Sequence, residues 1–599
     1  MRYPSSAVSM RFVAYASRLR KIIEPLADRF FGKAWPSYLF IVAFQLKRIW
    51  GIWWFRDLTL GDTSSYFLKA HRWYENLTAD IVWSPLYTAF YGTALLFTND
   101  VYAATILHRV IIVMVAAVGV LAVMRRLLPP AFALTVAVWW AFLPINFDPL
   151  YEVHLFALLP VLAAWLVAGS SDTSWARGSA LAILVVAAVL ARLEFLVGVI
   201  VYALVCLVRE TLELRQDRNA IGPTRQTRIA AYGVPLLLAV GLCAVFFWRS
   251  YIPDTLQHAN ARHVSNVCQG YAFTWLQIHP EATLDPWFEC DHLTEEVFGR
   301  HRPTIVQMLA ANPAAAWEFL WWNFSLSLNG LQLALFDGWT GWVNPDFGPV
   351  RHRHSVPATV ATIVVLFFVV KGGLIAVRQW GYWWKEWFQP RKGLWLIMLA
   401  MVCVSVPVVF VVRPRPSYLF PTTLVLMALI GTAAYIVSSR DQPRVPKALA
   451  IIALPLLLIA TPPYFKAPAD RPLYGSYQTL RPFAALLADE RNRIIIGDYA
   501  WDLKNYLMLG ERSTTFGYGI LSSWQAPQSL DQFLDAQGIN VFFVQPGLLE
   551  ELRTKPEARA LLEHPESLGW HRLAPADPGD TTWLLLYREP RPLPPRAAS

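Results

Sequence analysis

Seven acidic and arginine side chains stand at the ends of apolar stretches that lie far apart along this chain. An arginine guanidinium matches the oxygens of a phosphate group and keeps its charge. A carboxylate can remove the proton of an attacking hydroxyl group. If the apolar stretches bring these ends to one face, the residues predict a site that binds a phosphate and activates a hydroxyl. They are Asp62, Asp148, Glu152, Arg192, Glu194, Arg413 and Arg415.

The elements that position these residues follow from the composition. The chain has 599 residues, 55% of them hydrophobic and only 16% charged, and its mean hydropathy is +0.37. The surface of a soluble protein needs about a quarter charged residues, so the composition predicts a polytopic helical membrane protein. The net charge of +10 falls in short clusters between apolar spans. That distribution excludes a nucleic-acid partner, because it is the one that the positive-inside rule predicts.

The apolar stretches predict about eleven transmembrane helices. The stretch at about 84–98 is short for a crossing and is expected to be an interfacial or re-entrant helix. The crossings are expected at about 36–55, 101–124, 131–147, 151–169, two within 179–208, 230–249, 357–377, 393–412, 417–437 and 447–463.

Two of these stretches carry charges. Lys47 and Arg48 interrupt the first span, where they face protein, water or an anionic ligand, or extend to the interface. The stretch 179–208 has basic residues at both ends, so it enters the membrane and returns. Arg192, Leu193 and Glu194 then form the turn of a hairpin at the outer side. The alternative is that Arg192 and Glu194 are an ion pair that only stabilises the bend.

The distribution of basic residues sets the orientation. Six segments assigned to the cytoplasm hold 22 Lys and Arg residues in about 97, whereas the external segments 56–100 and 250–356 hold 8 in about 152. The basic N-terminal segment 1–35 lacks a signal-peptide cleavage site and is expected to stay cytoplasmic. The sequence therefore predicts a multi-pass protein of the inner (plasma) membrane with a cytoplasmic N-terminus and an extracytoplasmic C-terminus.

Asp62 is the acid around which the candidate site is organised. It stands in the sequence Gly-Asp-Thr-Ser-Ser before an aromatic helix, within the polar and aromatic segment 55–92. An acidic residue held at a membrane surface indicates a functional site. Aspartate is also one of the residues that cap helix N-termini. The residues alone leave both interpretations open.

The chain changes character after residue 463. The stretches Ile-Ile-Ile-Gly-Asp-Tyr, Asn-Val-Phe-Phe-Val-Gln-Pro and Thr-Trp-Leu-Leu-Leu-Tyr-Arg-Glu predict buried strands, and the helical stretch before the second ends at Gly538. We expect residues 464–599 to form a soluble extracytoplasmic α/β domain beside the transmembrane domain, 36–463. No phosphate-binding loop is present in it, so a structural or acceptor-docking role is favoured.

The five cysteines show no metal-ligand spacing such as a CxxC pair. Cys206, Cys243 and Cys403 lie inside apolar runs. Cys268 and Cys290 share one polar loop, and they can form a disulfide if that loop is extracytoplasmic.

Five motifs, in chain order, resemble those of the GT-C superfamily of integral membrane glycosyltransferases. The resemblance is to members that use polyprenyl-phosphate sugars, such as the protein mannosyltransferases and the lipid A aminoarabinose transferase. It covers residues 36–463, and the C-terminal domain fits the soluble module that many members append. The motifs are GDTSSYF, WSPLYTAFYG, PLYEVHLFALLPVLAAW, ARLEF and RPSYLFPTTLVLM.

The resemblance implies roles for individual residues. Asp62 matches the catalytic base of the first external loop, and Glu152 matches an acidic residue after the second external turn. Arg192-Leu193-Glu194 resembles a frequent Arg-Pro-Glu, and Arg415 with Tyr418 resembles an Arg-Tyr motif near the lipid phosphate. The implied substrate-binding set is Tyr66, Trp83, Tyr87, Asp148, Arg192, Glu194, Arg413, Arg415 and Tyr418.

The chain departs from the family pattern at two points. Leu193 replaces the usual proline, and the Asp-x-Asp pair of some members is absent around Asp62. With one acid in that loop, a divalent metal is not expected to be obligatory, and no other cofactor is implied. The implied reaction is inverting transfer of a hexosyl or pentosyl group from a polyprenyl-phosphate donor to an acceptor hydroxyl on a glycan, lipid or protein.

Three other functions stay open. A ligase or polymerase of lipid-linked oligosaccharides would use a pyrophosphate donor at a similar site. A transporter would show internal repeats or interrupted spans at matching positions, which the sequence lacks. A scaffold protein would explain the soluble domain but gives no reason for acids and arginines at one face.

Overall fold

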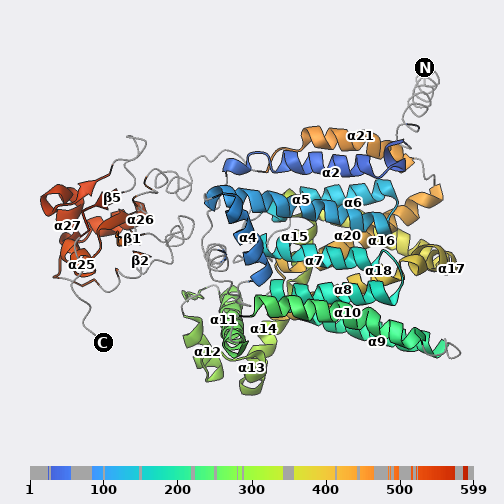
Figure 1. Ribbon diagram of the computed structural model, residues 1–599, viewed down its shortest axis with the longest axis horizontal. Helices are drawn as coiled ribbons and strands as arrows, with labels where there is room; N and C mark the ends of the chain where they lie inside the picture. Colours follow the sequence, from blue (N-terminus) through green and yellow to red (C-terminus); the bar gives the residue numbers. More distant parts are fainter. Residues whose placement is uncertain are drawn as a thin grey trace, which may run out of the picture. The chain divides into compact units, whose positions relative to one another are not determined.

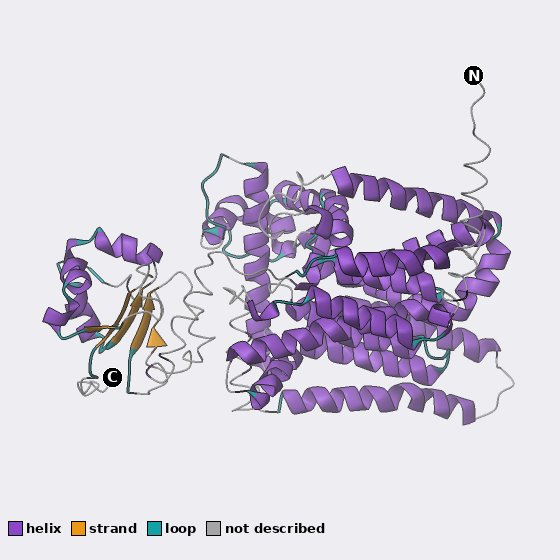
Figure 2. Cartoon of the chain, turned by 90° about the horizontal axis from the view of Figure 1, so that it is seen from above, coloured by secondary structure: helices purple, strands orange, loops and turns teal. Residues whose placement is uncertain are grey.

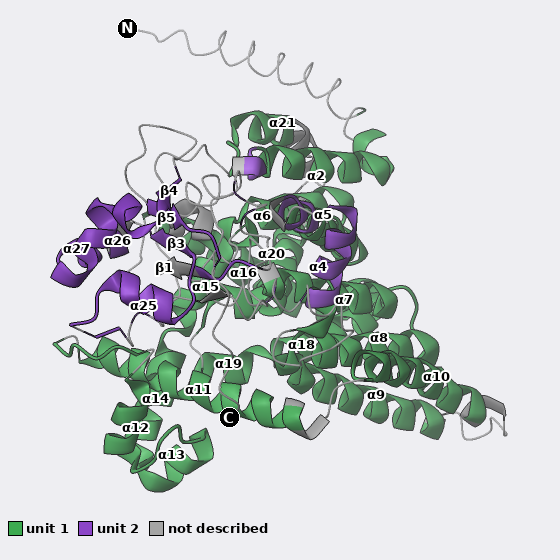
Figure 3. Ribbon diagram, turned by 60° about the vertical axis from the view of Figure 1, so that its left-hand side comes forward, with its two compact units in different colours: residues 1–50, 78–87, 109–464 green, residues 51–77, 88–108, 465–599 purple. Residues whose placement is uncertain are grey.

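A computed structural model of the chain separates two compact units (Figure 3). Unit 1 comprises residues 1–50, 78–87 and 109–464, and unit 2 comprises 51–77, 88–108 and 465–599. The structure describes residues 25, 29–54, 66, 70, 84–98, 101–147, 152–216, 223–248, 252–279, 281–286, 289–340, 356–411, 414–441, 445–464, 483, 486, 491–497, 515–516, 521, 524–525, 527–544, 546–573 and 584–590.

Long apolar helices dominate the described part of unit 1 (Figure 1). Most of α4 and the first turns of α5 belong to unit 2. The long helices and the two short ones between them, α17 and α19, are α2 (Trp35–Arg48), α4 (Pro85–Phe97), α5 (Val101–Leu127), α6 (Pro130–Phe142), α7 (Glu152–Ala168), α8 (Ser174–Val186), α9 (Leu196–Gln216), α10 (Pro223–Phe246), α16 (Val356–Arg378), α17 (Trp380–Trp383), α18 (Lys392–Val402), α19 (Ser405–Val411), α20 (Phe420–Asp441) and α21 (Val445–Ala460).

Seven segments of the described chain are long and apolar enough to cross a membrane. The protein is therefore a helical membrane protein. Helices α6 and α7 are apolar but shorter. The count of eleven crossings stays a prediction. The seven segments are Ala103–Leu127, Ser174–Ala191, Leu193–Arg215, Gln226–Phe246, Thr359–Arg378, Trp380–Val411 and Pro416–Ser439.

The third predicted span is shorter than expected. Helix α6 ends at Phe142, and Leu143 is extended with ψ 128°. Pro144 explains this end, because proline excludes the α conformation from the residue before it. A single 3₁₀ turn, Pro144–Phe147, follows in place of the last helical turn that the sequence predicted.

Glycines allow two pairs of helices in unit 1 to pack closely. A side chain on Gly178 of α8 would collide with the carbonyl oxygen of Ala231 in α10. A Cβ on Gly372 of α16 would lie 2.8 Å from the backbone of Ala433 in α20. Small residues are typical of such contacts in membranes, because they let helix backbones approach.

The two cations of α2 bind protein groups. Lys47 Nζ donates to the carbonyl oxygens of Leu458 and Ile459 at the end of α21. Arg48 is 5% exposed. Its guanidinium donates to Pro462 O at 2.8 Å and Phe142 O at 3.1 Å. Of the expected alternatives, contact with protein is confirmed, and extension to the interface stays a prediction. Both cations stabilise carbonyl groups that a helix end leaves unpaired.

The polar segment 250–356 is more helical than the sequence suggested. It contains α11 (Ile252–Ile278), α12 (Cys290–Phe298), α13 (Ile305–Ala311), α14 (Pro313–Ser325) and α15 (Ser327–Thr340). A capping box of Thr304 and Gln307 begins α13, and Asn312 caps α14. Buried Tyr271 and Phe319 pack in the core of these helices.

A disulfide joins Cys268 of α11 to Cys290 of α12, and their Cα atoms lie 5.6 Å apart. Both cysteines are buried. The pairing that the sequence allowed is therefore present. Beside it, Arg302 holds the Asp291 carboxylate with two hydrogen bonds of 2.7 and 2.8 Å. These bonds raise the pKa of Arg302 above its ordinary value.

Replacing both Cys268 and Cys290 by serine is expected to lower the free energy of unfolding by about 3 kcal/mol. The disulfide closes a loop of 22 residues, and closing such a loop restricts the unfolded chain. Thermal unfolding of the purified protein measures the loss, and reductant should destabilise the wild type alone. Cys403→Ser is the control, since Cys403 is a free thiol. Alkylation of Cys268 and Cys290 without reductant would contradict the pairing.

The described C-terminal residues of unit 2 form a five-stranded sheet in the order β2-β1-β3-β5-β4 (Figure 2). Strand β1 pairs in parallel with β2 and β3, while β5 is antiparallel to β3 and β4. The strands are β1 (Ile494–Gly497), β2 (Thr515–Phe516), β3 (Val541–Val544), β4 (His571–Arg572) and β5 (Leu584–Tyr587), with helices α25 (Leu530–Ala536), α26 (Pro546–Arg553) and α27 (Pro556–Glu563).

The three predicted strands are confirmed as β1, β3 and β5. Gly538, with φ 68°, follows α25 and turns the chain toward β3, as the sequence predicted. Strands β2 and β4 were missed, since each has two residues and shows no periodicity. The core includes Phe533, Phe542 and Trp570.

Candidate functional site

The hairpin of α8 and α9 turns at Arg192. Helix α8 passes into the π-helical turn η5 (Ala187–Ala191), and the backbone N–H of Arg192 donates to Ala187 O at 2.9 Å. Arg192 is extended, with φ −147° and ψ 112°, and the 3₁₀ turn η6 (Leu193–Phe195) leads into α9. The hairpin turn that the sequence predicted is confirmed. Single π-helical turns inside α-helices are frequent at functional sites.

Arg192 contacts both Glu194 and Tyr418. Its Nε donates to Glu194 Oε1 at 2.6 Å, and its guanidinium carbon lies 5.3 Å from the centroid of the Tyr418 ring. The ion pair proposed for the bend is therefore present. The cation–π contact shows that Arg192 also faces a residue more than 200 positions away, so the ion pair is only part of its environment.

Arg415 and Tyr418 lie on the short connection between α19 and α20. Arg415 is the cap of the 3₁₀ turn η10 (Pro416–Leu419), and the Tyr418 N–H donates to Arg415 O at 3.1 Å. Pro414 and Pro416 flank Arg415. Because proline fixes its own φ and restricts the residue before it, the connection holds Arg415 extended before the turn.

His154 is a member of the site that sequence reasoning missed. It lies in the first turn of α7, and its ring centroid is 4.5 Å from that of Tyr418 at 68°. Arg192 faces the same tyrosine ring, and Arg415 is the cap of the turn that carries Tyr418. The sequence signal for His154 is its position two residues after Glu152, in the motif PLYEVHLFALLPVLAAW. Only the acid of that motif was predicted to belong to the site. Tyr87 of α4 packs on Phe156, two residues further along α7, at 5.3 Å.

The structure thus brings together part of the predicted set. Arg192, Glu194, Arg415 and Tyr418 form one cluster with His154, which we call the hairpin-end cluster. Tyr87 is buried against Phe156 of α7, and Tyr66 is buried in unit 2. Glu152 begins α7, and its side chain is not described. Asp62, Trp83, Asp148 and Arg413 lie outside the described residues.

The groups of the hairpin-end cluster suit an anionic ligand with oxygen atoms. Two guanidinium groups supply a fixed positive charge and forked donors. The His154 imidazole and the Tyr418 hydroxyl add groups that donate or accept hydrogen bonds. One set of metal-type ligands occurs in the described residues, namely Cys268, Cys290 and Asp291. Its cysteines are joined as a disulfide and its carboxylate binds Arg302, so those residues do not fit a metal ion.

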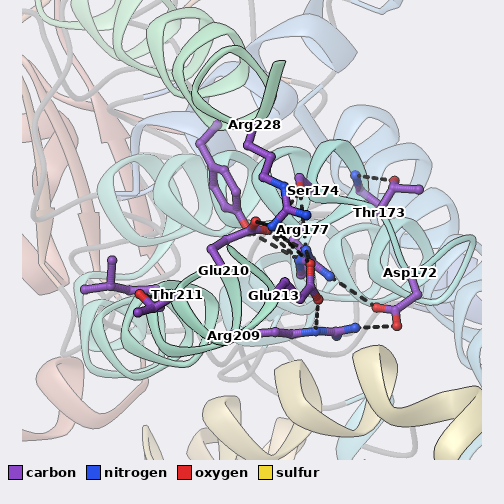
Figure 4. Close-up of polar contacts among 12 residues, drawn as sticks. Asp172, Thr173, Ser174, Arg177, Arg209, Glu210, Thr211, Glu213 and Arg228 are labelled. Carbon is purple, nitrogen blue, oxygen red and sulfur yellow. Dashed lines mark hydrogen bonds and ion pairs between the residues drawn. The ribbon is translucent and has the colours of Figure 1, made fainter. Parts of the chain in front are cut away.

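A second polar cluster lies at the other end of the hairpin (Figure 4). Arg177 of α8 is buried and pairs with Glu210 and Glu213 of α9 and with Asp172 before α8. Glu210 also accepts from Tyr232 of α10 at 2.9 Å. Further pairs come from Arg209, Arg228 and Lys392. We call this group the hairpin clamp.

The hairpin clamp is structural, because its described cations and carboxylates are engaged with one another. Burial alone would raise the pKa of Asp172, but Arg209 and Lys392 lower it below its ordinary value. Asp172 is therefore ionised at neutral pH. Arg177 itself is buried, so removal of its partners is costly, since it leaves a buried charge without compensation. The clamp thus fixes the ends of α8 and α9 far from the turn that carries Arg192.

No protein-family model, curated protein or solved structure matches this chain. Its class follows from its own features: a helical membrane protein with a cluster of arginine, histidine and tyrosine residues where three helical segments meet.

Proposed function

We propose that the protein is an inverting membrane glycosyltransferase that moves a hexosyl or pentosyl group from a polyprenyl-phosphate donor to an acceptor hydroxyl. The observation that carries the proposal is that Tyr418 meets both Arg192 and His154 and lies in the turn that Arg415 begins. The three segments that supply these residues are separated by whole helices. The two guanidinium groups outweigh the single carboxylate of Glu194, and the net positive charge at the end of apolar helices suits a lipid-linked phosphate.

In the proposed mechanism, one base and a stabilised leaving group are sufficient. Asp62 accepts the proton of the acceptor hydroxyl, whose oxygen attacks the anomeric carbon of the sugar. The bond from that carbon to the phosphate oxygen breaks, and the polyprenyl phosphate departs with the electron pair. Arg192 and Arg415 stabilise the charge that develops on the phosphate. Attack from the opposite side inverts the anomeric configuration.

The proposal includes an arrangement in the membrane. Eleven crossings of GT-C type would place the hairpin-end cluster at the extracytoplasmic face and the hairpin clamp at the cytoplasmic face. This orientation rests on the excess of Lys and Arg in the segments assigned to the cytoplasm. The C-terminal domain would then lie outside the inner membrane, where acceptors of the cell envelope are available.

The proposed activity is tested with purified protein, an envelope extract as acceptor, and radiolabelled polyprenyl-phosphate sugars. We expect labelled acceptor and free polyprenyl phosphate in equal amounts, because each transfer releases one lipid phosphate. The matched control is the same sugar on polyprenyl pyrophosphate. Turnover of the pyrophosphate donor alone would identify a ligase or polymerase. Failure of every donor in the panel would contradict the proposal.

A further inference from the structure

The outer surface of α16 carries two cations on one face. The apolar segment Thr359–Arg378 is 11% buried within the protein, so most of its surface is available to lipid. Lys371 and Arg378 are both exposed. They are seven residues apart, which places them on the same side of the helix about 10 Å apart along its axis.

These cations are not neutralised within the part of the chain that the structure describes. Lys371 Nζ lies 5.6 Å from the ring of Phe367, one turn earlier in α16. No carboxylate of the described residues pairs with Lys371, Arg378 or the exposed Lys385 that follows α17. A cation on a lipid-facing surface is costly unless an anion or water reaches it. An anion bound at this surface would remove that cost, and the exposed Glu386 adjoins only Lys385.

The segment that follows α16 carries two buried and two exposed tryptophans. Trp383 and Trp387 are buried, and their rings lie 6.0 and 4.7 Å from that of Tyr435 in α20. Trp380 and Trp384 stack on each other at 5.2 Å, yet they are 54% and 48% exposed. One tryptophan pair fixes the segment to the helices, and the other faces outward.

Exposed tryptophan beside lysine and arginine is typical of protein surfaces at the level of lipid headgroups. The tryptophans begin the second of two adjoining apolar segments, Thr359–Arg378 and Trp380–Val411. If both segments cross a membrane, the turn between them is expected at its surface. Exposed Leu374 and Val377 continue the surface into the apolar part of α16. Cations, exposed tryptophans and apolar side chains thus occur together at the end of one apolar helix, as they do where lipid headgroups meet acyl chains.

We propose that Lys371, Arg378, Trp380, Trp384 and Lys385 form a binding surface for an anionic phospholipid. Arg378 binds the headgroup phosphate, Lys371 reaches it from one side along α16, and the outward tryptophan pair lies beside the headgroup. The surface is built from residues that the hairpin-end cluster does not use, so it is independent of the proposed glycosyl transfer. Charge favours an anionic lipid over a second copy of the chain, which would bring like charges together.

The proposal is tested by native mass spectrometry of the full chain in detergent, titrated with phosphatidylglycerol or phosphatidylcholine. A cation near a lipid surface contributes about 1 kcal/mol. Arg378→Gln is therefore expected to weaken phosphatidylglycerol binding about fivefold, and the Lys371→Gln/Arg378→Gln protein about 25-fold. Binding of phosphatidylcholine should be weaker in the wild type and unchanged in both variants.

Arg215→Gln is the matched control, because Arg215 is an exposed cation at the end of α9 without the tryptophan pair. It should bind phosphatidylglycerol within about twofold of the wild type, well below the effect of one specific cation. Three results would overturn the proposal: equal affinity for the two lipids, an equal loss in Arg215→Gln, or a dimer that disappears in the double variant. The last would assign the surface to a second copy.

Discussion

Replacing Arg192 by glutamine is expected to lower kcat/KM for a polyprenyl-phosphate sugar by about 10²- to 10³-fold, the cost of losing a donor that stabilises developing charge. Glutamine keeps a hydrogen-bonding group but removes the positive charge that faces Tyr418. Arg192→Lys should recover only part of the activity, because an ammonium lacks the forked geometry. Initial rates of label transfer at several donor concentrations measure the effect.

Arg302→Gln is the matched control for this prediction. It also removes an arginine paired with a carboxylate, but Arg302 lies beside the disulfide, and its side chain is 51% exposed. An exposed pair contributes about 0–1 kcal/mol, so activity should stay close to that of the wild type. If Arg192→Gln is fully active and only its thermal unfolding changes, Arg192 serves the hairpin turn and the phosphate site is assigned wrongly.

Asp62→Asn is expected to retain donor binding while transfer falls by about 10²-fold or more, since a positioned base contributes at least that much. Asparagine matches aspartate in size and is an equally good helix cap. A capping role would therefore tolerate the substitution, whereas a base would not. The prediction rests on the sequence and the proposed reaction, because Asp62 lies outside the described residues. Transfer and donor binding are measured on the same preparation.

The amide variants of two other acids show whether Asp62 in particular carries the proton. Glu152→Gln and Asp148→Asn should keep more activity than Asp62→Asn. If either of them is inactive while Asp62→Asn turns over normally, another acid is the base. Full activity of all three variants would remove the chemistry from the proposed function.

The sequence predicted the long apolar helices and the turn at Arg192, because both depend on neighbouring residues. Hydropathy indicates a span, and basic residues at both ends of a long apolar stretch indicate a hairpin. It did not predict α11, whose polar residues, such as Gln257 and Arg262, show no apolar run. The end of α6 at Phe142 was missed for a different reason. A hydropathy average is little changed by Pro144, but that single proline keeps Leu143 out of the α conformation and ends the helix.

The site was predicted as a set of residues at helix ends, but the contacts within it required the structure. The Arg192–Glu194 ion pair joins residues two positions apart, and the sequence offered it as one interpretation of the turn. The contact of His154 with Tyr418 joins residues 264 positions apart, and nothing near either residue in the sequence indicates the other. The same holds for the hairpin clamp, where Arg177 meets Glu210 and Tyr232 from two other helices.

The hairpin clamp and the turn η5 together limit where this chain can gain or lose a residue during evolution. Deleting one residue between Arg177 and Val186 would turn Arg192 by about 100° relative to the clamp and move it about 1.5 Å, away from Tyr418. A π-helical turn holds one residue more than an α-helical turn. Any relative that keeps both ends of the hairpin should therefore vary in length within Ala187–Ala191, where one deletion restores a regular helix.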